Sequence, residues 1–492
     1  MYKRIIVLLC AVLFYTDGLA QPGRPNIILV MADDLGYGDV HYNGNKTVKT
    51  PNLDQMAATG IRFTRFYAAA PVCTPTRASC LTGRHPYRMN MTWASDKSLP
   101  REEYTLAEAL RDAGYATGHF GKWHLGDLSK TMKDGYAPGM PDPAQYAPPW
   151  ENGFEECYSV YSSMPSYNPY YFVSPDMGSP GYKMIQDQPI APGQRTGGFV
   201  WNTKIWTGPG RFTDEWVEGA FDSLVMDKAL DFITRKTTAQ QPFLSLIWFT
   251  TPHTPVVAGN SYRALYPGLT MQEQHWFGAI TAMDAQIGRL QKKLNELGIA
   301  ENTVVWFCSD NGPSWVHDLN SAGGLRGKKG SLYEGGIRVP SLLLFPSKYK
   351  APAVIDAPVT TSDFFSTVLS WAAVKNHGSA VLDGINADAI IARKATRRSV
   401  PIGFASPVLQ TDARDAKAWT KYGGRALCWL DNDYKLISTD DGKTWELYNL
   451  GRDRSEKNNI ANTNTVRMQA MKAQLYQWLS SVEQSAKGAD YR

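Results

Sequence analysis

The sequence predicts an α/β fold, in which a large, mixed but mostly parallel β-sheet lies between helices and a smaller C-terminal α+β domain follows. Continuous apolar runs, which are typical of strands buried on both faces of a parallel sheet, alternate along the chain with segments of helical periodicity. After about residue 375 the apolar runs become short, and the chain ends in one amphipathic helix. We therefore expect two domains, at 21–375 and 376–492, which the length of 492 residues allows.

Each element of the first domain has a local reason. The run NIILVMA at 26–32 is apolar throughout and predicts a fully buried strand. Thr105 and Glu108 form a capping-box pattern that predicts the start of a helix, and Ile280 and Met283 belong to a run of helical spacing. In chain order, we expect a strand at 26–32, a helix at 52–60, a strand at 61–67, a helix at 105–114, strands at 116–119 and 243–249, a helix at 273–297 and a strand at 303–308.

Two further segments differ from this pattern. Residues 134–210 are crowded with proline, glycine and aromatic residues, which predicts a long insertion in loop form. The C-terminal segment predicts a small antiparallel sheet with strands at 426–430, 434–438 and 444–448, followed by a helix at 465–482.

The first twenty residues are typical of a secretory signal peptide. Lys3 and Arg4 precede an apolar run at 5–15, and the small residues Gly18 and Ala20 offer a cleavage site. We expect an exported protein, periplasmic or secreted. No later run is long enough to span a bilayer, and a formal charge of +5 over 492 residues gives no nucleic-acid footprint.

Polar side chains follow the ends of four expected strands. They are Asp33 and Asp34 after the first strand, Lys122 and His124 after the strand at 116–119, His253 after that at 243–249, and Asp310 and Asn311 after that at 303–308. Ligands of open α/β sheets bind at the carboxyl ends of the strands, so these side chains should converge on one site. The carboxylates and the amide among them supply only oxygen ligands, which suits Ca²⁺ or Mg²⁺. A lone Asp-Asp pair is most often a cap or a turn, so this hypothesis depends on the convergence.

The run CTPTRASCLTGR at 73–84 carries the most specific signal in the chain. Its Cys-x-Pro-x-Arg core and the following Leu-Thr-Gly-Arg resemble the signature of type I sulfatases. Blocks similar to that family also occur, in the family order, at 26–38 (NIILVMADDLGYG), 121–126 (GKWHLG), 251–255 (TPHTP), 309–313 (SDNGP), 325–340 (LRGKKGSLYEGGIRVP) and 446–450 (ELYNL, followed by Asp453 and Glu456). The resemblance covers nearly the whole chain after residue 20 and implies the fold of the alkaline phosphatase superfamily.

This resemblance implies a nucleophile and a metal. Cys73 would be converted to formylglycine by a maturation enzyme, and the hydrated aldehyde would attack sulfur, with Asp310 as a plausible base. The resemblance also implies a calcium ion, in preference to magnesium, whose ligands would be Asp33, Asp34, Asp310, Asn311 and the modified Cys73.

The resemblance also implies the remaining roles in the site. Arg77, Lys122 and Lys329 would surround the sulfate group, and Lys329 matches the family's lysine better than its neighbour Lys328 does. His253 would protonate the leaving oxygen. His124 would take the proton released when the aldehyde forms again.

The export signal, the mild positive charge and the ring-rich insertion favour a sulfated carbohydrate as substrate, either an algal galactan such as carrageenan or a glycosaminoglycan. His85, Trp315 and His317 are candidate substrate contacts; the alternative is that such rings pack within their own domain. One rival function is a phosphate or phosphonate ester hydrolase of the same superfamily, which turnover of aryl phosphates would distinguish. The other is a non-catalytic glycan-binding protein, which would not need both a nucleophile and an acid.

Overall fold

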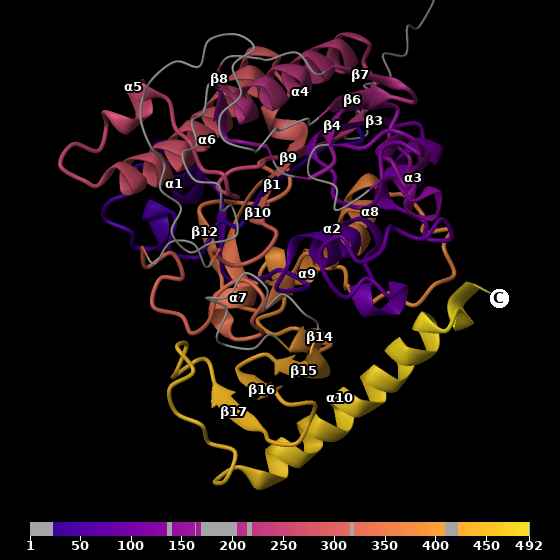
Figure 1. Cartoon of the computed structure of the whole chain (residues 1–492), viewed down its shortest axis with the longest axis vertical. Coiled ribbons are helices and arrows are strands. Elements are labelled where there is room, and N and C mark those ends of the chain that lie inside the picture. The colour runs from indigo at the N-terminus through magenta and orange to yellow at the C-terminus, as the bar shows by residue number, and fades with distance from the viewer. Residues whose placement is uncertain are drawn as a thin grey trace, which may run out of the picture.

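The computed structural model describes residues 23–491, except 135–139, 163, 169–203, 214–218, 315–318 and 409–421. The expected signal peptide and much of the expected insertion at 134–210 lie outside the described residues. The prediction of a loop is wrong for part of the remainder, because β4 (Glu156–Val160) and β6 (Ile205–Gly208) are strands of the large sheet. In the described part, the chain forms one large sheet that lies between two layers of helices, and a separate, small antiparallel sheet follows in the C-terminal part. The predicted fold class is therefore confirmed (Figure 1).

Four adjacent parallel strands form the centre of the large sheet. β1 (Asn26–Ala32) pairs with β10 (Thr303–Ser309) on one side and with β9 (Phe243–Trp248) on the other. β3 (Ala116–Lys122) pairs with β9 and runs three residues further than the sequence predicts. Because these strands are parallel, their carboxyl ends lie at the same edge of the sheet.

The flanks of the large sheet are mixed. β11 (Arg338–Leu344) runs antiparallel between β10 and β2 (Ile61–Tyr67). The sequence does not predict β11, because Arg338 and Pro340 interrupt its apolar run. The other described strands are β4 (Glu156–Val160), β6 (Ile205–Gly208), β7 (Arg211–Thr213), β12 (Ala353–Ile355) and β13 (Val359–Thr360) in this sheet, and β5 (Tyr167–Asn168) and β8 (Gly219–Ala220) in a separate pair.

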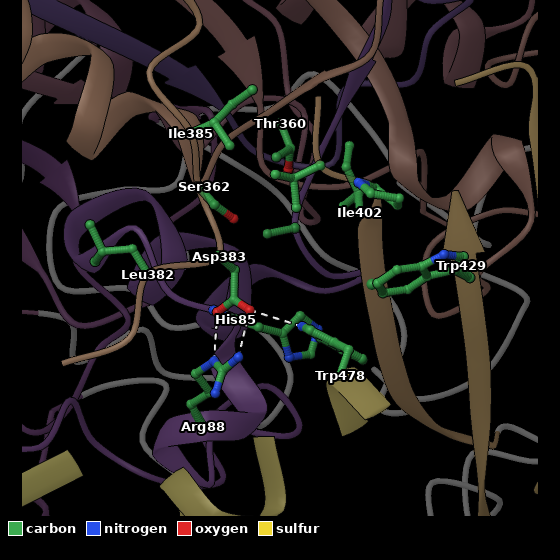
Figure 2. Close-up of a pocket in the computed structure, with 15 residues that line it drawn as sticks. His85, Arg88, Thr360, Ser362, Leu382, Asp383, Ile385, Ile402, Trp429 and Trp478 are labelled. Carbon is green, nitrogen blue, oxygen red and sulfur yellow. Dashed lines mark hydrogen bonds and ion pairs between the residues drawn. The ribbon is translucent and has the colours of Figure 1, made fainter. Parts of the chain in front are cut away.

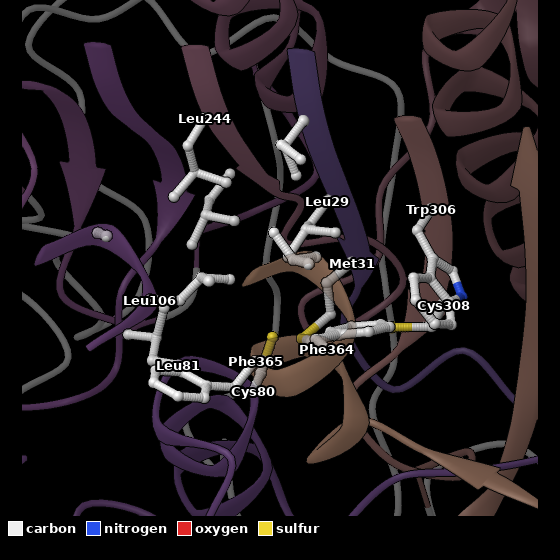
Figure 3. Close-up of a cluster of buried hydrophobic side chains, with 14 of the residues drawn as sticks. Leu29, Met31, Cys80, Leu81, Leu106, Leu244, Trp306, Cys308, Phe364 and Phe365 are labelled. Carbon is white, nitrogen blue, oxygen red and sulfur yellow. The ribbon is translucent and has the colours of Figure 1, made fainter. Parts of the chain in front are cut away.

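Helices cover both faces of the sheet because alternate side chains of β1 point to opposite sides. Ile28 and Val30 belong to one buried cluster, and Leu29 and Met31 to the other, which Figure 3 shows. The first cluster packs under α1 (Pro51–Thr59), α4 (Phe221–Thr238) and α6 (Met271–Glu296), and the second under α2 (Cys73–Thr82), α3 (Leu106–Asp112) and α8 (Asp363–Ala372). Burying each such aliphatic side chain contributes about 1.5–3 kcal/mol, so β1 is firmly fixed.

The C-terminal part is built on the small sheet. Its strands, in order, are β14 (Ile402–Val408), β15 (Tyr422–Asp431), β16 (Tyr434–Ser438) and β17 (Glu446–Asn449), all antiparallel. One face packs against α10 (Thr465–Ala486) through Leu427 and Leu475. The other face packs against the large-sheet part through Tyr67 and Ile337. The remaining α-helices of the described residues are short: α5 (Asn260–Arg263), α7 (Glu334–Ile337) and α9 (Asp388–Ile391).

Two properties of the described residues concern membrane-spanning helices and disulfide bonds. None of its helices is long and apolar enough to cross a membrane. Cys80, Cys157, Cys308 and Cys428, whose pairing the sequence leaves open, are buried and carry no disulfide bond in this structure.

Candidate active site

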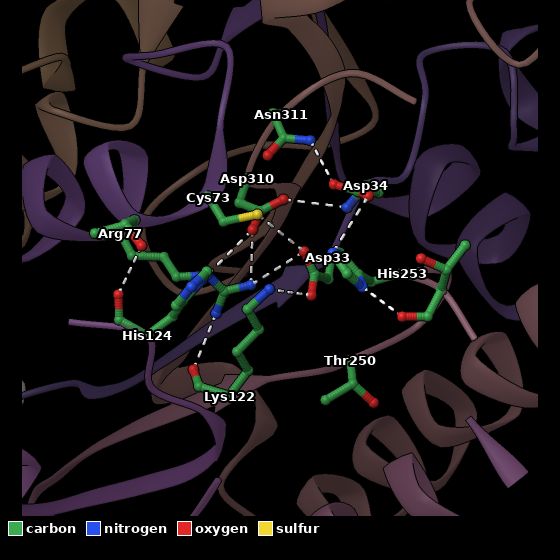
Figure 4. A network of polar contacts seen from close by, with 12 residues as sticks. Asp33, Asp34, Cys73, Arg77, Lys122, His124, Thr250, His253, Asp310 and Asn311 are labelled. Carbon is green, nitrogen blue, oxygen red and sulfur yellow. Dashed lines mark hydrogen bonds and ion pairs between the residues drawn. The ribbon is translucent and has the colours of Figure 1, made fainter. Parts of the chain in front are cut away.

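The candidate site lies at the carboxyl edge of the four central strands. Asp33 and Asp34 follow β1 directly, and Asp310 and Asn311 follow β10 directly. His253 lies in the loop after β9, while Lys122 ends β3 and His124 comes two residues later. Figure 4 shows that these side chains converge, as their positions at the strand ends predict.

Cys73 occupies the first position of α2 and points into this cluster. The preceding Val72 is extended, so the helix begins where the chain enters the site. The Cys73 Sγ lies 3.5 Å from Asp33 Oδ1 and 3.4 Å from Lys329 Nζ. Burial raises the pKa of the thiol to about 12, although Lys122 and Lys329 oppose this shift. At neutral pH the unmodified side chain is therefore a thiol and a weak nucleophile.

Arg77 lies one helical turn after Cys73 and presents its guanidinium to the same site. Its Nε and one terminal nitrogen donate to Asp310 Oδ2 at 3.1 and 2.7 Å, and the other terminal nitrogen donates to the carbonyl of Lys122 at 3.0 Å. The guanidinium also lies 5.1 Å from the ring centroid of Trp248. These contacts fix the orientation of a fully buried cation.

Two lysines complete the positive side of the cluster. Lys122 Nζ lies 2.7 Å from Asp33 Oδ2, and Lys329 Nζ lies 2.6 Å from Asp34 Oδ1. Of the tandem pair Lys328 and Lys329, only Lys329 is buried. Three cations therefore face three carboxylates in a buried centre, where unpaired charges of either sign would be costly.

The carboxylates differ in their protonation behaviour. Burial alone would raise the pKa of Asp33, but the charges of Lys122, Arg77 and Lys329 hold it well below its usual range. Burial and the nearby charge of Asp33 raise the pKa of Asp310 to about 7, against the opposite effect of Arg77. The crowding of negative charge is the state that a bound cation would relieve.

The carboxylate and amide oxygens at the site fit a hard cation. Ligand atoms of Asp33, Asp34, Cys73 and His253 all lie within 4.8 Å of one another. Asn311 Nδ2 donates to Asp34 Oδ1 at 2.7 Å, whereas the buried Asn311 Oδ1 has no hydrogen-bond partner in the described structure. An unsatisfied buried amide oxygen beside carboxylates is a fitting ligand for Ca²⁺.

Two of the predicted metal ligands need closer description. Asp310 lies in the cluster, but both of its carboxylate oxygens already accept hydrogen bonds, Oδ2 from Arg77 and Oδ1 from the backbone N–H of Asp34 at 3.1 Å. Asp34 has a φ of 64°, so its backbone turns sharply beside the site. His253, which the sequence predicts only as an acid, also joins the group of ligand atoms.

Both predicted histidines border the cluster and are neutral. His253 Nδ1 lies 2.7 Å from the carbonyl of Thr254, so Nδ1 carries the hydrogen and Nε2, 3.8 Å from Asp34 Oδ2, faces the site. Burial lowers the pKa of His253 to about 4, although Asp33 and Asp34 raise it. Burial, assisted by Lys122, also lowers the pKa of His124 well below its usual value.

The structure adds two neighbours that the sequence does not indicate. Ser95 Oγ lies 2.8 Å from His124 Nε2, and Thr74 Oγ1 donates to the carbonyl of His124 at 2.9 Å. Ser95 and His124 also line a surface pocket of about 120 Å³ together with Gln145 and Tyr161. Nothing in the local sequence marks Ser95, because its role depends on how the loop after η2 (Pro86–Met89) folds back toward β3.

Of the three predicted substrate contacts, His85 alone lies among the described residues, and it is not part of this cluster. Trp315 and His317 lie outside the described residues. His85 follows the far end of α2, a helix of ten residues, and is therefore about 15 Å away from Cys73 along the axis. Its ring packs 4.8 Å from that of Trp478 and lines a cavity of about 190 Å³ between the two parts of the chain (Figure 2). This placement gives no support to a substrate contact for His85.

Comparisons with known proteins agree with this arrangement. A family model described as Sulfatase matches residues 25–374. N-acetylgalactosamine-6-sulfatase of Mus musculus is 30% identical over 485 residues, covering 94% of this chain and 81% of that protein. Arylsulfatase A of Homo sapiens is 34% identical over 367 residues, covering 72% of this chain and 65% of that protein. The crystal structure of Ps i-CgsB in complex with k-i-k-neocarrahexaose has a TM-score of 0.75 at 26% identity and covers 95% of this chain and 97% of that one.

Proposed function

This chain belongs to the sulfatase family and is a sulfuric ester hydrolase, and from that premise we propose that it releases inorganic sulfate from a sulfated carbohydrate. The observation that carries the proposal is the ring of three buried cations, Arg77, Lys122 and Lys329, around the first residue of α2. Such a ring suits a small oxyanion, because fixed donors in a dry site stabilise negative charge that develops during the reaction.

The residues of the site fit the two groups that the family resemblance implies, a calcium ion and a formylglycine. Asp33, Asp34, Asp310, Asn311 and residue 73 would hold a calcium ion, which would polarise a sulfate oxygen and lower the pKa of the attacking hydroxyl. A formylglycine made from Cys73 would supply that hydroxyl in its hydrated form. The high pKa of the unmodified thiol supports this modification, because Cys73 itself would react poorly.

The remaining side chains handle binding and protons. Lys122 and Lys329 would neutralise the ester sulfate, and Arg77 would orient residue 73 from one turn along the same helix. Hydrolysis breaks the bond between sulfur and the sugar oxygen, so that oxygen must gain a proton as it leaves. His253 Nε2 faces the site and would supply this proton, because an anionic substrate beside the imidazole raises its pKa. His124, held by Ser95, would accept a proton in the second step.

The class of substrate rests on the relatives. The structural neighbour Ps i-CgsB was crystallised with an oligosaccharide, k-i-k-neocarrahexaose, and the mouse relative is named for a sulfated sugar. These names support a sulfated polysaccharide, an algal galactan such as carrageenan or a glycosaminoglycan. Export through the signal peptide expected at 1–20 would bring the protein to where such polymers occur.

Turnover by protein made in its native secretory route tests the proposal. We expect release of sulfate from an aryl sulfate. Turnover of the matching aryl phosphate should be at least about tenfold slower, because an enzyme discriminates between related esters by binding their transition states with different strength. A chelator should abolish release and added calcium should restore it, whereas Asp34→Asn should lose the response to calcium. Faster turnover of the phosphate would favour the rival hydrolase. Binding of a sulfated glycan with no release by fully modified protein would favour the glycan-binding alternative.

A further inference from the structure

The segment 325–337, which we call the lysine loop, carries Lys329 and is tied to the candidate site by its backbone. The N–H of Lys329 donates to the carbonyl of Pro313 at 3.0 Å, just beyond Asn311. The N–H of Gly330 donates to the carbonyl of Pro71 at 2.8 Å, two residues before Cys73. The loop therefore closes one side of the site.

The other end of the lysine loop is held by the C-terminal part of the chain. Glu334 accepts from Lys435 Nζ at 2.9 Å, and the N–H of Glu334 donates to Glu456 Oε2 at 2.7 Å. Lys435 Nζ also lies 2.9 Å from Glu456 Oε1. Lys435 belongs to β16 and Glu456 lies in the loop after β17, so both come from the C-terminal part of the chain. All three side chains are buried, and Tyr67 and Arg338 satisfy the remaining oxygen of Glu334.

The lysine loop is folded too tightly to absorb a movement at one end. The N–H of Gly335 donates to the carbonyl of Arg326 at 2.7 Å, across the loop. A Cβ atom at Gly335 would lie 2.1 Å from the carbonyl oxygen of Gly327, and one at Gly336 would lie 1.9 Å from that of Ser331. Close packing of this kind transmits displacement, so a shift of Glu334 should move Lys329.

We propose that Lys435 and Glu456 are positioning residues, which hold the lysine loop so that Lys329 reaches the oxyanion site. Neither side chain contacts the cluster around Cys73 in the described structure; both act through Glu334 and the loop. This inference rests on the proposed function, which gives Lys329 its sulfate. It also gives a physical role to Glu456, which the sequence places in the motif near the C-terminus but which no step of the reaction uses.

A neutral side chain at position 456 isolates this role. Glu456→Gln keeps the shape of the side chain and can still accept from the N–H of Glu334, but it removes the charge that faces Lys435. Glu103→Gln is the matched control, because Glu103 and Arg84 form another buried ion pair, at 2.8 Å, outside the lysine loop.

The test is a double-mutant cycle on the affinity for inorganic sulfate, measured by calorimetry on the full-length, calcium-supplied protein. We expect Glu456→Gln to weaken sulfate binding about tenfold, and Lys329→Ala to weaken it at least as much. In the Lys329→Ala background, Glu456→Gln should cost less than about twofold, because its effect passes through Lys329. Glu103→Gln should leave the affinity unchanged.

Each alternative result has a distinct meaning. Additive effects of Glu456→Gln and Lys329→Ala, or an unchanged affinity in Glu456→Gln, would overturn the positioning role. If Glu456→Gln does not fold, as thermal melting would reveal, Lys435→Met enters the same cycle with the same expectation. Failure of the unsubstituted protein to bind sulfate would overturn the proposed function itself, and the inference with it.

Discussion

Cys73→Ala is expected to abolish sulfate release, with a loss on the order of 10⁴-fold or more, as when a covalent nucleophile is removed. No other described nucleophile stands at the centre of the three cations. The fold should survive, because the change removes one buried sulfur atom, worth about 1 kcal/mol as a methylene-sized group. Turnover of an aryl sulfate and the melting temperature measure the two effects.

Cys80→Ala is the matched control for this prediction. Cys80 lies in the same helix, is fully buried and belongs to the apolar cluster between α2 and the sheet. Its replacement should lower the melting temperature about as much as Cys73→Ala does and leave turnover intact. Turnover above about one hundredth of the normal rate in Cys73→Ala would contradict the assignment of the nucleophile, since that exceeds what such a loss allows.

His253→Ala should slow hydrolysis in proportion to the basicity of the leaving alcohol. A sugar alkoxide is a poor leaving group and needs the proton, so we expect a loss of about 10²–10⁴-fold on a sulfated sugar. A nitrophenolate leaves without help, so the loss on an activated aryl sulfate should stay below about tenfold. Parallel measurement of kcat/KM on both substrates gives the comparison.

His124→Ala provides the contrast. The proposed role of His124 begins after the alcohol has left. The loss of activity in His124→Ala should therefore be similar on the sulfated sugar and on the activated aryl sulfate. An equal loss on both substrates in His253→Ala would show that His253 does not act as the general acid. The ring would then be a positioning group or a metal ligand, as its distance of 3.8 Å to Asp34 also allows.

Strands with one simple pattern could be predicted from the sequence. β1, β9 and β10 are apolar along their whole length, and burial on both faces is what such a run requires. α3 begins at the predicted capping box of Thr105 and Glu108, with both hydrogen bonds present. β11 and β14 were not predicted. Arg338 and Pro340 in β11 break the pattern, and their places are decided by neighbouring strands.

The composition of the candidate site could be predicted in the same way, but its pairing could not. The rule that ligands bind at the carboxyl ends of strands brings Asp33 and Asp310 together, and the structure agrees. In the structure, Arg77 forms an ion pair with Asp310, and Lys122 forms one with Asp33. This pairing depends on the register of the strands and the direction of α2. The place of His85 could not be predicted either, because its distance from Cys73 depends on the straight run of α2 between them.

The mass of the tryptic peptide 66–77, from protein made in its native secretory route, tests the central claim most directly. The account predicts that residue 73 carries an aldehyde, and that the share of modified peptide in different preparations rises in step with their rate of sulfate release. A thiol at residue 73 in natively produced, active protein would contradict the account, because the nucleophile it names would not exist.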